Sequence, residues 1–269
     1  MRVLVTGATG FLGRHLLPEL AERHEVVALA RRPVDGIETV VADLAGDFPV
    51  PDGLDAVVHL AQSRRYREWP EGAADVYAVN VNATFRLLGR AERFVLASTG
   101  GVYAPSSDPL DEDAPLAPTG FYPRSKLAAE LLAGPYGAVI LRPFFIYGPG
   151  QEGMLIASLA TRVQAGDEVV VQGDPGIRIT PIHVSDAVRA VVAAVELGRP
   201  ATVNVAGAEA IALTELVQLL AELDGRDPRI RHAEDAGGDL VADIRRMRQL
   251  LGVTPAVSLR DGLAGVLAR

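Results

Sequence analysis

Short apolar runs recur along the first half of the chain, and amphipathic stretches separate several of them. Such runs are typical of buried strands, and apolar positions repeating about every 3.6 residues are typical of helices. The expected strands are residues 2–6, 25–30, 39–42, 55–60, 94–97 and 138–141, and the helical patterns cover 11–23, 73–91 and 122–133. Strands that alternate with helices predict a parallel sheet with helices on both faces. The expected fold class is therefore α/β, a Rossmann-type doubly wound parallel sheet with a small C-terminal substrate lobe.

The rhythm changes after Tyr147-Gly148-Pro149-Gly150. The second half is expected to contain strand-like runs at 168–172, 179–184 and 202–205, a short extended piece, and helices at 153–165, 185–197, 212–223, 243–251 and 258–268. Ser185 is expected to be the N-cap of its helix. We expect residues 1–150, with a returning strand near 202–206, to form a dinucleotide-binding core, and 151–269 to form mainly a substrate-binding lobe.

Composition narrows the classes of function. The chain has 269 residues, no cysteine and a formal net charge of −8. Disulfides, Cys-ligated metals and Cys nucleophiles are excluded, no metal site is predicted, and neither nucleic acid nor a membrane is an expected partner. The first apolar run stops at Thr6-Gly7, unlike a signal peptide, and no segment reaches the roughly 18 apolar residues of a membrane span. A cytoplasmic location is therefore expected.

A glycine-rich turn follows the first expected strand. Gly7, Gly10 and Gly13 have the spacing G-x-x-G-x-x-G. Glycines between a strand and a helix allow the backbone to approach a pyrophosphate, which the N–H groups at the helix N-terminus can bind. The spacing differs from G-x-G-x-x-G, so three ordinary turn and packing glycines are the alternative. The position after the first strand favours a dinucleotide site.

Two arginines follow the second expected strand, where NAD sites usually carry an acid. Arg31 and Arg32 suit a 2′-phosphate, which favours NADP(H) and leaves NAD(H) open. The alternative is a pair of solvated arginines on a loop. Asp43-Leu44 follows the third strand, where it could cap the adenine amino group or form an ordinary turn.

Hydroxyl and ammonium groups provide candidate chemistry. Tyr122 and Lys126 have i, i+4 spacing and share one face of the expected helix. A nearby cation is expected to lower the pKa of the phenol and make it a usable proton donor and acceptor. Ser98-Thr99 ends the fifth strand, where a hydroxyl could bind a substrate oxygen. Taken alone, an amphipathic surface helix and a strand-end turn explain these residues equally well.

Several motifs together resemble the extended short-chain dehydrogenase/reductase family, in its sugar-nucleotide epimerase/dehydratase/reductase branch. The matching stretches are TGATGFLG (6–13), ADL (42–44), HLAQ (59–62), VNVNAT (79–84), ASTGGVYAP (97–105), YPRSK (122–126), LRPFFIYGPG (141–150), IHVSDAV (182–188) and ADIRRMRQLLGVTPAVSLRDGL (242–263). They cover nearly the whole chain in order, so the combination is far more specific than any single motif.

The resemblance implies a role for each matching residue. Thr99 would be the catalytic hydroxyl, Tyr122 the acid/base, Lys126 the group that holds the nicotinamide ribose, and Asn80 its support. The implied cofactor-binding residues are Gly7, Thr9, Gly10, Phe11, Leu12, Gly13, Arg31, Arg32, Asp43, Leu44, Leu60, Ala61, Gln62, Ala97, Ser98, Tyr122, Lys126, Pro143 and Phe145. The implied substrate-binding residues are Gln62, Thr99, Gly100, Phe144 and Arg178.

Departures from the family pattern narrow the chemistry. Gly100-Gly101 stand where the 4,6-dehydratases of this branch carry an acid pair, so water loss is not expected. The 3,5-epimerase-reductases rely on a cysteine, which this chain lacks. Phe144-Phe145 replace a substrate-contacting asparagine of many relatives. Many relatives have an arginine four residues before the position that matches His183, whereas Arg178 lies five residues before it. On a strand, a shift of one residue moves a side chain to the opposite face.

The leading hypothesis is an NADP(H)-dependent ketoreductase that acts on a nucleotide-linked deoxysugar. Its choice over the alternatives depends mainly on Arg31-Arg32, because epimerases of this branch usually retain NAD. Three alternatives stay open: a sugar-nucleotide 4-epimerase, a reductase or dehydrogenase of a non-nucleotide substrate such as a sugar acid or polyketide ketone, and a non-catalytic NADP(H)-binding regulator. Relatives often dimerise through the helices near 73–91 and 122–133, and a homodimer is expected here.

Overall fold

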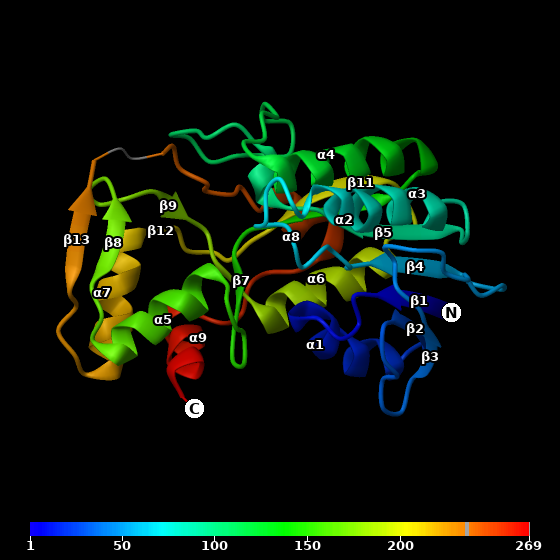
Figure 1. The fold of residues 1–269 in the computed structure, drawn as a ribbon, viewed down its shortest axis with the longest axis horizontal. Coiled ribbons are helices and arrows are strands. Elements are labelled where there is room, and N and C mark those ends of the chain that lie inside the picture. The colour runs from blue at the N-terminus through cyan, green and yellow to red at the C-terminus, as the bar shows by residue number, and fades with distance from the viewer. Residues whose placement is uncertain (235–236, 269) are drawn as a thin grey trace.

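A seven-stranded parallel sheet forms the centre of the computed structural model, which describes residues 1–234 and 237–268 (Figure 1). Its strand order is β11-β6-β5-β4-β1-β2-β3. The strands are β1 (Arg2–Thr6), β2 (Glu25–Ala30), β3 (Glu38–Val41), β4 (Ala56–His59), β5 (Arg93–Ala97), β6 (Val139–Pro143) and β11 (Ala201–Val205). The order reverses beside β1, because β2 pairs on one side of it and β4 on the other. This is the expected Rossmann-type α/β fold.

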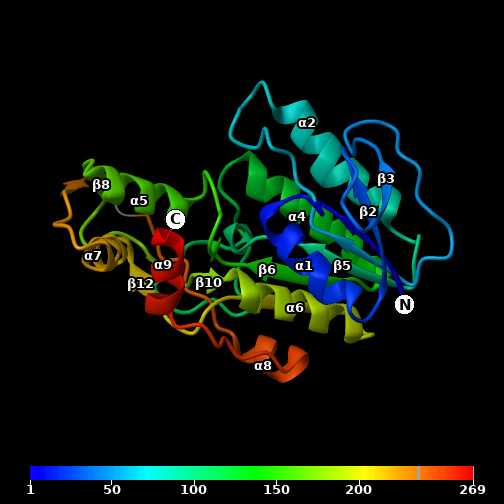
Figure 2. The ribbon, with the colours of Figure 1, turned by 90° about the horizontal axis from the view of Figure 1, so that it is seen from below.

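Helices cover both faces of the sheet (Figure 2). Alternate residues of β1 serve opposite faces: Val3 and Val5 pack in one apolar cluster with α1 (Phe11–Ala21) and α6 (Val184–Glu196). Leu4 packs in a second cluster with α3 (Ala83–Leu87) and α4 (Phe121–Ala133). Because a parallel strand is buried on both faces, its sequence is continuously apolar, which is the pattern that predicted these strands.

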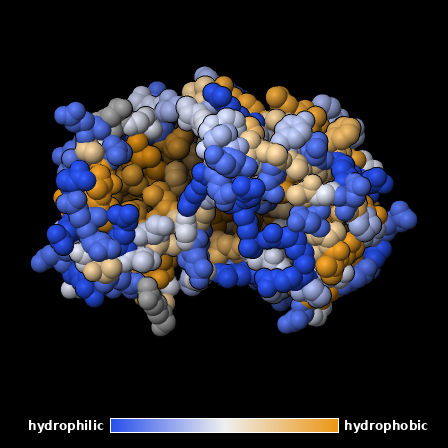
Figure 3. Space-filling model, in the orientation of Figure 1, coloured by the Kyte–Doolittle hydropathy of each residue, from blue (hydrophilic) through white to orange (hydrophobic). Residues whose placement is uncertain are grey.

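A smaller group of elements lies beside the sheet, at the left of Figure 1, and the surface is hollowed between this group and the sheet (Figure 3). It comprises α5 (Leu155–Ala165), β8 (Val169–Gln172), β9 (Arg178–Ile179), β12 (Ile211–Ala212), α7 (Leu213–Asp224), β13 (Ile230–Ala233) and α9 (Leu259–Leu267). These elements share a separate apolar cluster around Val171, Ile179 and Leu216. β7 (Ile146–Tyr147) and β10 (Ile182–His183) pair with each other, and α8 (Arg245–Leu251) packs on the α6 side. The exact limits of a substrate lobe stay a prediction.

The helix expected at 73–91 is divided into three pieces. α2 (Ala73–Tyr77) continues into a π-helical turn, η1 (Ala78–Asn82), and then into α3. Within this region, Thr84 Oγ1 donates to the Asn80 carbonyl oxygen at 2.8 Å. The chain leaves the helix at Leu88, which is extended, and Gly89 then adopts a φ of 73°. The expectation of one continuous helix to residue 91 is therefore wrong.

The strand expected at 179–184 is also divided. β9 pairs with β12 in an antiparallel manner, and β10 pairs with β7 in parallel. Pro181 lies between them and has no N–H to donate to a ladder, so a single strand cannot continue. The N-cap of α6 is His183, whose Nδ1 accepts from the Ser185 N–H at 3.3 Å, so the expectation that Ser185 is the cap is wrong.

The remaining expected elements occur in their predicted places, with ends shifted by one or two residues. Two 3₁₀ turns, η2 (Gly100–Val102) and η3 (Gly134–Tyr136), complete the assignment. Among the described residues, no helix is long and apolar enough to cross a membrane.

Candidate active site

The glycine turn joins β1 to α1 at the carboxyl edge of the sheet. Gly7 has a φ of 70°, and a Cβ there would lie 2.7 Å from the Ala61 nitrogen. A Cβ on Gly13 would overlap the Gly7 carbonyl oxygen. Gly10 is the N-cap of α1 and brings no side-chain acceptor, so the first N–H groups of the helix are available to an anion. These glycines thus allow close packing within the turn and against the segment after β4, and their role in binding a pyrophosphate stays a prediction.

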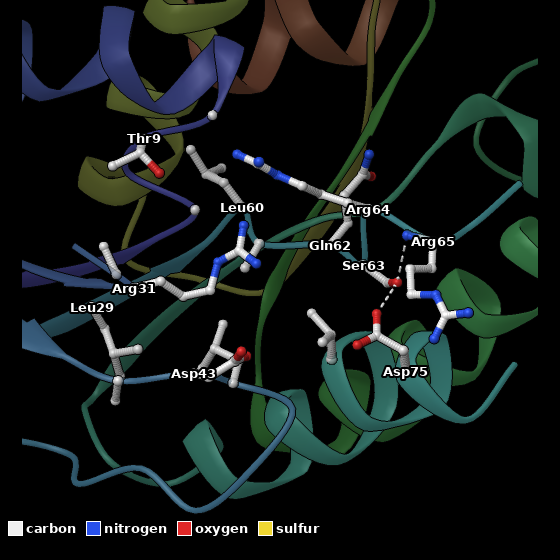
Figure 4. Close-up of a pocket in the computed structure, with 17 residues that line it drawn as sticks. Thr9, Leu29, Arg31, Asp43, Leu60, Gln62, Ser63, Arg64, Arg65 and Asp75 are labelled. Atoms are coloured by element: carbon white, nitrogen blue, oxygen red, sulfur yellow. Dashed lines mark hydrogen bonds between the residues drawn. The ribbon is translucent and has the colours of Figure 1, made fainter. Parts of the chain in front are cut away.

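A cavity of about 330 Å³ lies next to this turn (Figure 4). Its lining includes these expected cofactor residues: Gly7, Thr9, Gly10, Arg31, Asp43, Leu44, Leu60, Ala61 and Gln62. We call it the adenosine-side cavity, because it lies between the ends of β2, β3 and β4, where a Rossmann fold holds the adenosine half of a dinucleotide.

Two guanidiniums face the adenosine-side cavity from different strands. Arg31 follows β2, and Arg64 follows β4 and extends toward the glycine turn (Figure 4). Within the described part of the chain, neither side chain forms a hydrogen bond or ion pair, whereas Arg65 Nε pairs with Glu68 at 2.7 Å. Arg32 does not line the cavity. The sequence analysis missed Arg64, although its place after a parallel strand was the same signal that singled out Arg31.

A second cavity, of about 460 Å³, lies on the other side of the glycine turn and is called here the catalytic cavity. Among its lining residues are Phe11, Leu12, Gly13, Ala97, Ser98, Thr99, Gly100, Tyr122, Lys126, Pro143, Phe144 and Phe145. Gly7, Gly10, Leu60 and Gln62 line both cavities. The fold therefore gives an extended ligand two adjacent compartments, one lined by Arg31, Arg64 and Arg65 and one lined by the candidate catalytic groups.

The Tyr122 side chain is partly buried at the N-terminus of α4. Its hydroxyl donates to Gln62 Oε1 at 2.7 Å, and the Tyr66 ring lies 5.0 Å from its own ring. Burial raises the pKa of Tyr122, and the neighbouring Tyr66 adds to the rise. The expectation that Lys126 lowers this pKa is wrong for this arrangement, because loss of solvation dominates. The phenol therefore keeps its proton at neutral pH.

Lys126 is also buried and donates to the Ala97 carbonyl oxygen at 2.8 Å. Burial lowers the pKa of Lys126 to about 8, and the carboxylate of Glu130 opposes that fall. His59 lies at the end of β4. Burial, and to a smaller extent the charge of Lys126, lower the pKa of His59 to about 3. His59 Nδ1 lies 2.7 Å from Thr6 Oγ1. The neutral imidazole of His59 and the ammonium group of Lys126 thus both lie close to the catalytic cavity.

Thr99 begins the 3₁₀ turn η2 and accepts from the Gly101 N–H at 3.1 Å, so its own hydroxyl proton can point elsewhere. The following glycine is closely packed: a Cβ on Gly100 would lie 2.7 Å from the Phe144 ring. Phe145 adopts a φ of 45°, in the left-handed region that costs a non-glycine residue on the order of 1 kcal/mol or more. Such outliers cluster at functional sites.

Three expected site residues make hydrogen bonds or ion pairs with other parts of the protein. Asn80 contacts Ser125 and the Ser63 N–H, both at 2.9 Å, so its side chain supports α4 beside Lys126. Ser98 donates to Glu130. Arg178 pairs with Asp239 at 2.8 Å and lines neither cavity.

The segment after β4 contacts distant parts of the chain, among them Met154, which lines the catalytic cavity. Tyr66 Oη lies 3.5 Å from Met154 Sδ, and Arg67 Nη1 donates to the Gly153 carbonyl oxygen at 2.9 Å. Trp69 packs on Phe121 with ring centroids 4.6 Å apart. These contacts join the segment after β4 to α4 and to the loop before α5. Sequence reasoning missed Tyr66 and Met154 because no local pattern connects them.

A Rossmann-type sheet with a glycine turn, two adjacent cavities at its carboxyl edge, and a tyrosine and a lysine of one helix lining the second cavity defines a dinucleotide-dependent oxidoreductase class. The chain belongs to the NAD dependent epimerase/dehydratase family, which it matches over residues 3–206. It is an NAD(P)-dependent enzyme of the oxidoreductase/epimerase kind, in the extended short-chain dehydrogenase/reductase group.

Individual relatives span nearly the whole chain. It is 30% identical to an uncharacterized UDP-glucose epimerase, YtcB, of Bacillus subtilis, over 100% of this chain and 97% of that protein. It is also 30% identical to dTDP-4-dehydro-6-deoxy-D-allose reductase of Streptomyces bikiniensis, over 97% and 93%. Among solved structures, MoeE5 in complex with UDP-glucose and NAD superposes with a TM-score of 0.86 at 32% identity, covering 99% of this chain and 97% of that one.

Proposed function

We propose that this enzyme is an NADP(H)-dependent reductase that converts a keto group of a nucleotide-linked deoxysugar into an alcohol. The observation that carries the proposal is the Tyr122 phenol, which is partly buried, lines the catalytic cavity and has a raised pKa. Reduction of a carbonyl needs a group that carries a proton at working pH and can deliver it to the developing alkoxide. A protonated phenol at this place suits that direction of reaction.

The roles of the other residues follow from their placement. Bound NADPH would supply a hydride to the carbonyl carbon. Tyr122 would give its proton to the carbonyl oxygen, and the Thr99 hydroxyl would donate a hydrogen bond to that oxygen. The Lys126 ammonium would stabilise the phenolate that remains and hold the nicotinamide ribose. Asn80 would keep α4 in place through Ser125.

The preference for NADP(H) rests on charge in the adenosine-side cavity. Arg31 and Arg64 carry guanidiniums that make no ion pair within the described residues, and a 2′-phosphate would supply one. No carboxylate follows β2, where an NAD site usually has one for the ribose hydroxyls. NAD(H) is the alternative, and the MoeE5 complex contains NAD.

The substrate class rests on the relatives. The Streptomyces relative is by name a reductase of a dTDP-linked keto sugar, and the MoeE5 complex holds UDP-glucose. A sugar-nucleotide 4-epimerase is the second candidate, favoured by the name of the Bacillus relative. An epimerase would use Tyr122 and Lys126 with a cofactor that stays bound through the cycle.

One experiment separates these functions. The purified protein is mixed with NADPH or NADH and with keto-sugar nucleotides, sugar acids or polyketide ketones, while the absorbance of the reduced nicotinamide is followed. Loss of NADPH absorbance with a keto-sugar nucleotide supports the proposal. Tightly bound NAD in the purified protein, with epimerised product and no net NADPH consumption, would instead identify the epimerase.

A homodimer is part of the proposal. Tyr77, Phe85 and Leu131 are 54%, 58% and 70% exposed on α2, α3 and α4. These helices cover the same face of the sheet (Figure 2). Large exposed apolar side chains on neighbouring helices suit an interface with a second copy of the chain.

A further inference from the structure

A buried polar cluster lies behind the catalytic cavity. Its members are Ser98, Tyr103, Glu130, Arg142 and Asn204, each at most 5% exposed, and we call it the Glu130 cluster. Arg142 Nη2 donates to Glu130 Oε2 at 2.7 Å, and Arg142 Nε donates to Oε1 at 3.1 Å. Arg142 Nη1 donates to Tyr103 Oη at 2.8 Å, which in turn donates to Asn204 Oδ1 at 2.7 Å.

A buried polar cluster of this kind adds little to the free energy of unfolding, because removing its charges from water is unfavourable. Removing two charges from water costs several kcal/mol per ion in a protein, and a buried ion pair is often no more stabilising than apolar residues of the same volume. This pair is bidentate and fully hydrogen-bonded, which offsets the cost and fixes its geometry. This arrangement therefore fixes where the Glu130 and Arg142 side chains lie more than it stabilises the fold.

The cluster contacts both elements that carry the candidate catalytic groups. Glu130 lies four residues after Lys126 on α4, so the two side chains share a face of one helix. Ser98, which donates to Glu130, is the residue before Thr99. The Glu130 carboxylate therefore faces the lysine and also holds the end of β5 against α4.

We propose that Glu130 is a positioning residue for the reaction: it fixes the β5 end that carries Thr99 relative to α4, and supplies the negative charge that faces Lys126. The inference rests on the proposed function, because it assumes that Thr99, Tyr122 and Lys126 act on the substrate and cofactor. Glu130 itself lines neither cavity.

In the described part of the chain, few other charged groups lie around Lys126 and Glu130. His59 on β4 faces Lys126 and is neutral because burial lowers its pKa to about 3. Glu130 faces Arg142 on β6 and the Tyr103 hydroxyl after η2. Glu112 lies at the far end of the cluster, where it accepts from the Asn204 N–H at 2.8 Å and pairs with Arg246 at 3.4 Å. Glu130 is thus the anion that opposes the effect of burial on the pKa of Lys126.

The test is Glu130→Gln, which keeps the shape and removes the charge. We expect kcat to fall about tenfold, and the basic limb of the kcat/KM profile to move to lower pH by about one unit, because Lys126 loses its proton more easily. The matched control is Glu112→Gln, which removes a buried carboxylate next to the cluster without touching α4, and should leave the limb in place. Ser98→Ala should lower kcat without moving the limb.

The outcomes separate the two proposals. If Glu130→Gln retains the wild-type kcat and pH profile while Tyr122→Phe is inactive, the positioning role is refuted and the proposed function stands. If Tyr122→Phe keeps its turnover, the proposed function itself fails. Should Glu130→Gln not fold, the double variant Glu130→Gln/Arg142→Gln removes both charges together. The basic limb must still move to lower pH, by less than in the single variant, because the Arg142 cation that opposes Glu130 is lost as well.

Discussion

The hydroxyl of Tyr122 donates to Oε1 of Gln62 across 2.7 Å, so the candidate proton donor already has a partner from the segment after β4. An acceptor that binds the neutral phenol stabilises its protonated form. Gln62 also lines both cavities and is therefore placed to contact a ligand in either of them. This contact connects the strand that ends beside the glycine turn with the helix that carries the chemistry.

Replacing Gln62 with leucine should make the Tyr122 phenol more acidic, because the neutral form loses its hydrogen-bond acceptor. The pKa of Tyr122 should then fall by up to about one unit. The measurement is an ultraviolet titration of the tyrosines in both proteins at alkaline pH, with Tyr122→Phe identifying the contribution of Tyr122. An unchanged titration would show that the Gln62 contact has no effect on the acidity of the phenol.

Tyr122→Phe removes the proposed proton donor and keeps the ring that packs on Tyr66. Turnover should fall by about 10²- to 10⁴-fold, the usual contribution of general acid catalysis. NADPH binding, measured by fluorescence titration, should stay within about threefold of wild type because the hydroxyl is only one of many cofactor contacts. Tyr136→Phe is the matched control, since Tyr136 is exposed and lines neither cavity.

Arg31→Ala and Arg64→Ala should each weaken NADPH binding about tenfold or more and change NADH binding much less, because only NADPH carries the 2′-phosphate. Arg32→Ala is the control, since Arg32 does not line the adenosine-side cavity. Dissociation constants for both dinucleotides decide the matter. Equal losses for NADH and NADPH would mean that these arginines contact the pyrophosphate or nothing at all.

Because of His59, the free energy of unfolding should decrease as the pH falls. Burial lowers its pKa to about 3 in the folded protein, whereas the ordinary value of 6.5 applies when the chain unfolds. Below pH 6.5 the unfolded chain binds a proton that the folded protein does not. This single group should therefore lower the free energy of unfolding by about 1.4 kcal/mol for each pH unit of acidification.

Denaturant unfolding of wild type and His59→Gln between pH 7 and pH 4 measures that contribution, because carboxylates affect both proteins alike. The variant should show the smaller loss of stability on acidification. His232→Gln changes an exposed histidine and should follow the wild-type curve. Parallel curves for all three proteins would contradict the assignment.

Phe85→Glu and Leu131→Glu should convert the proposed dimer to a monomer, because each places a charge on an exposed apolar position of α3 or α4. Light scattering after size-exclusion chromatography gives the mass directly. Val170→Glu is the control, since Val170 is an exposed apolar residue of β8, away from these helices. A monomeric wild-type protein would refute the dimer.

Local patterns were sufficient to predict most of the fold. β1, β2 and β5 are buried on both faces, so their apolar runs are continuous and flanked by turn residues. The break at Pro181 was missed because β9 and β10 pair with different partners, and a strand's partners are not visible in its own sequence. The π-helical turn at Ala78–Asn82 kept the apolar spacing of a regular helix and was missed for the same kind of reason.

The site residues could be predicted from the sequence where they lie close together along the chain. They could not be predicted where their contacts join distant parts of the chain. Tyr122 and Lys126 share one helix, and the sequence placed both on α4. Arg178 was a reasonable anion-binding candidate, yet its partner Asp239 lies 61 residues further along the chain. The pKa of Tyr122 was predicted in the wrong direction because burial depends on the whole fold, whereas the neighbouring lysine is evident from sequence.

The packing of Gly100 against Phe144 also constrains how this enzyme could change its chemistry. A carboxylate side chain at position 100, as dehydratases of the branch carry after their catalytic threonine, would need a Cβ 2.7 Å from the Phe144 ring. We expect an acid at position 100 to clash with the intact ring, and a smaller residue at 144 alone to leave a void. Positions 100 and 144 are therefore expected to be coupled, so that a carboxylate at 100 is tolerated only together with a smaller side chain at 144.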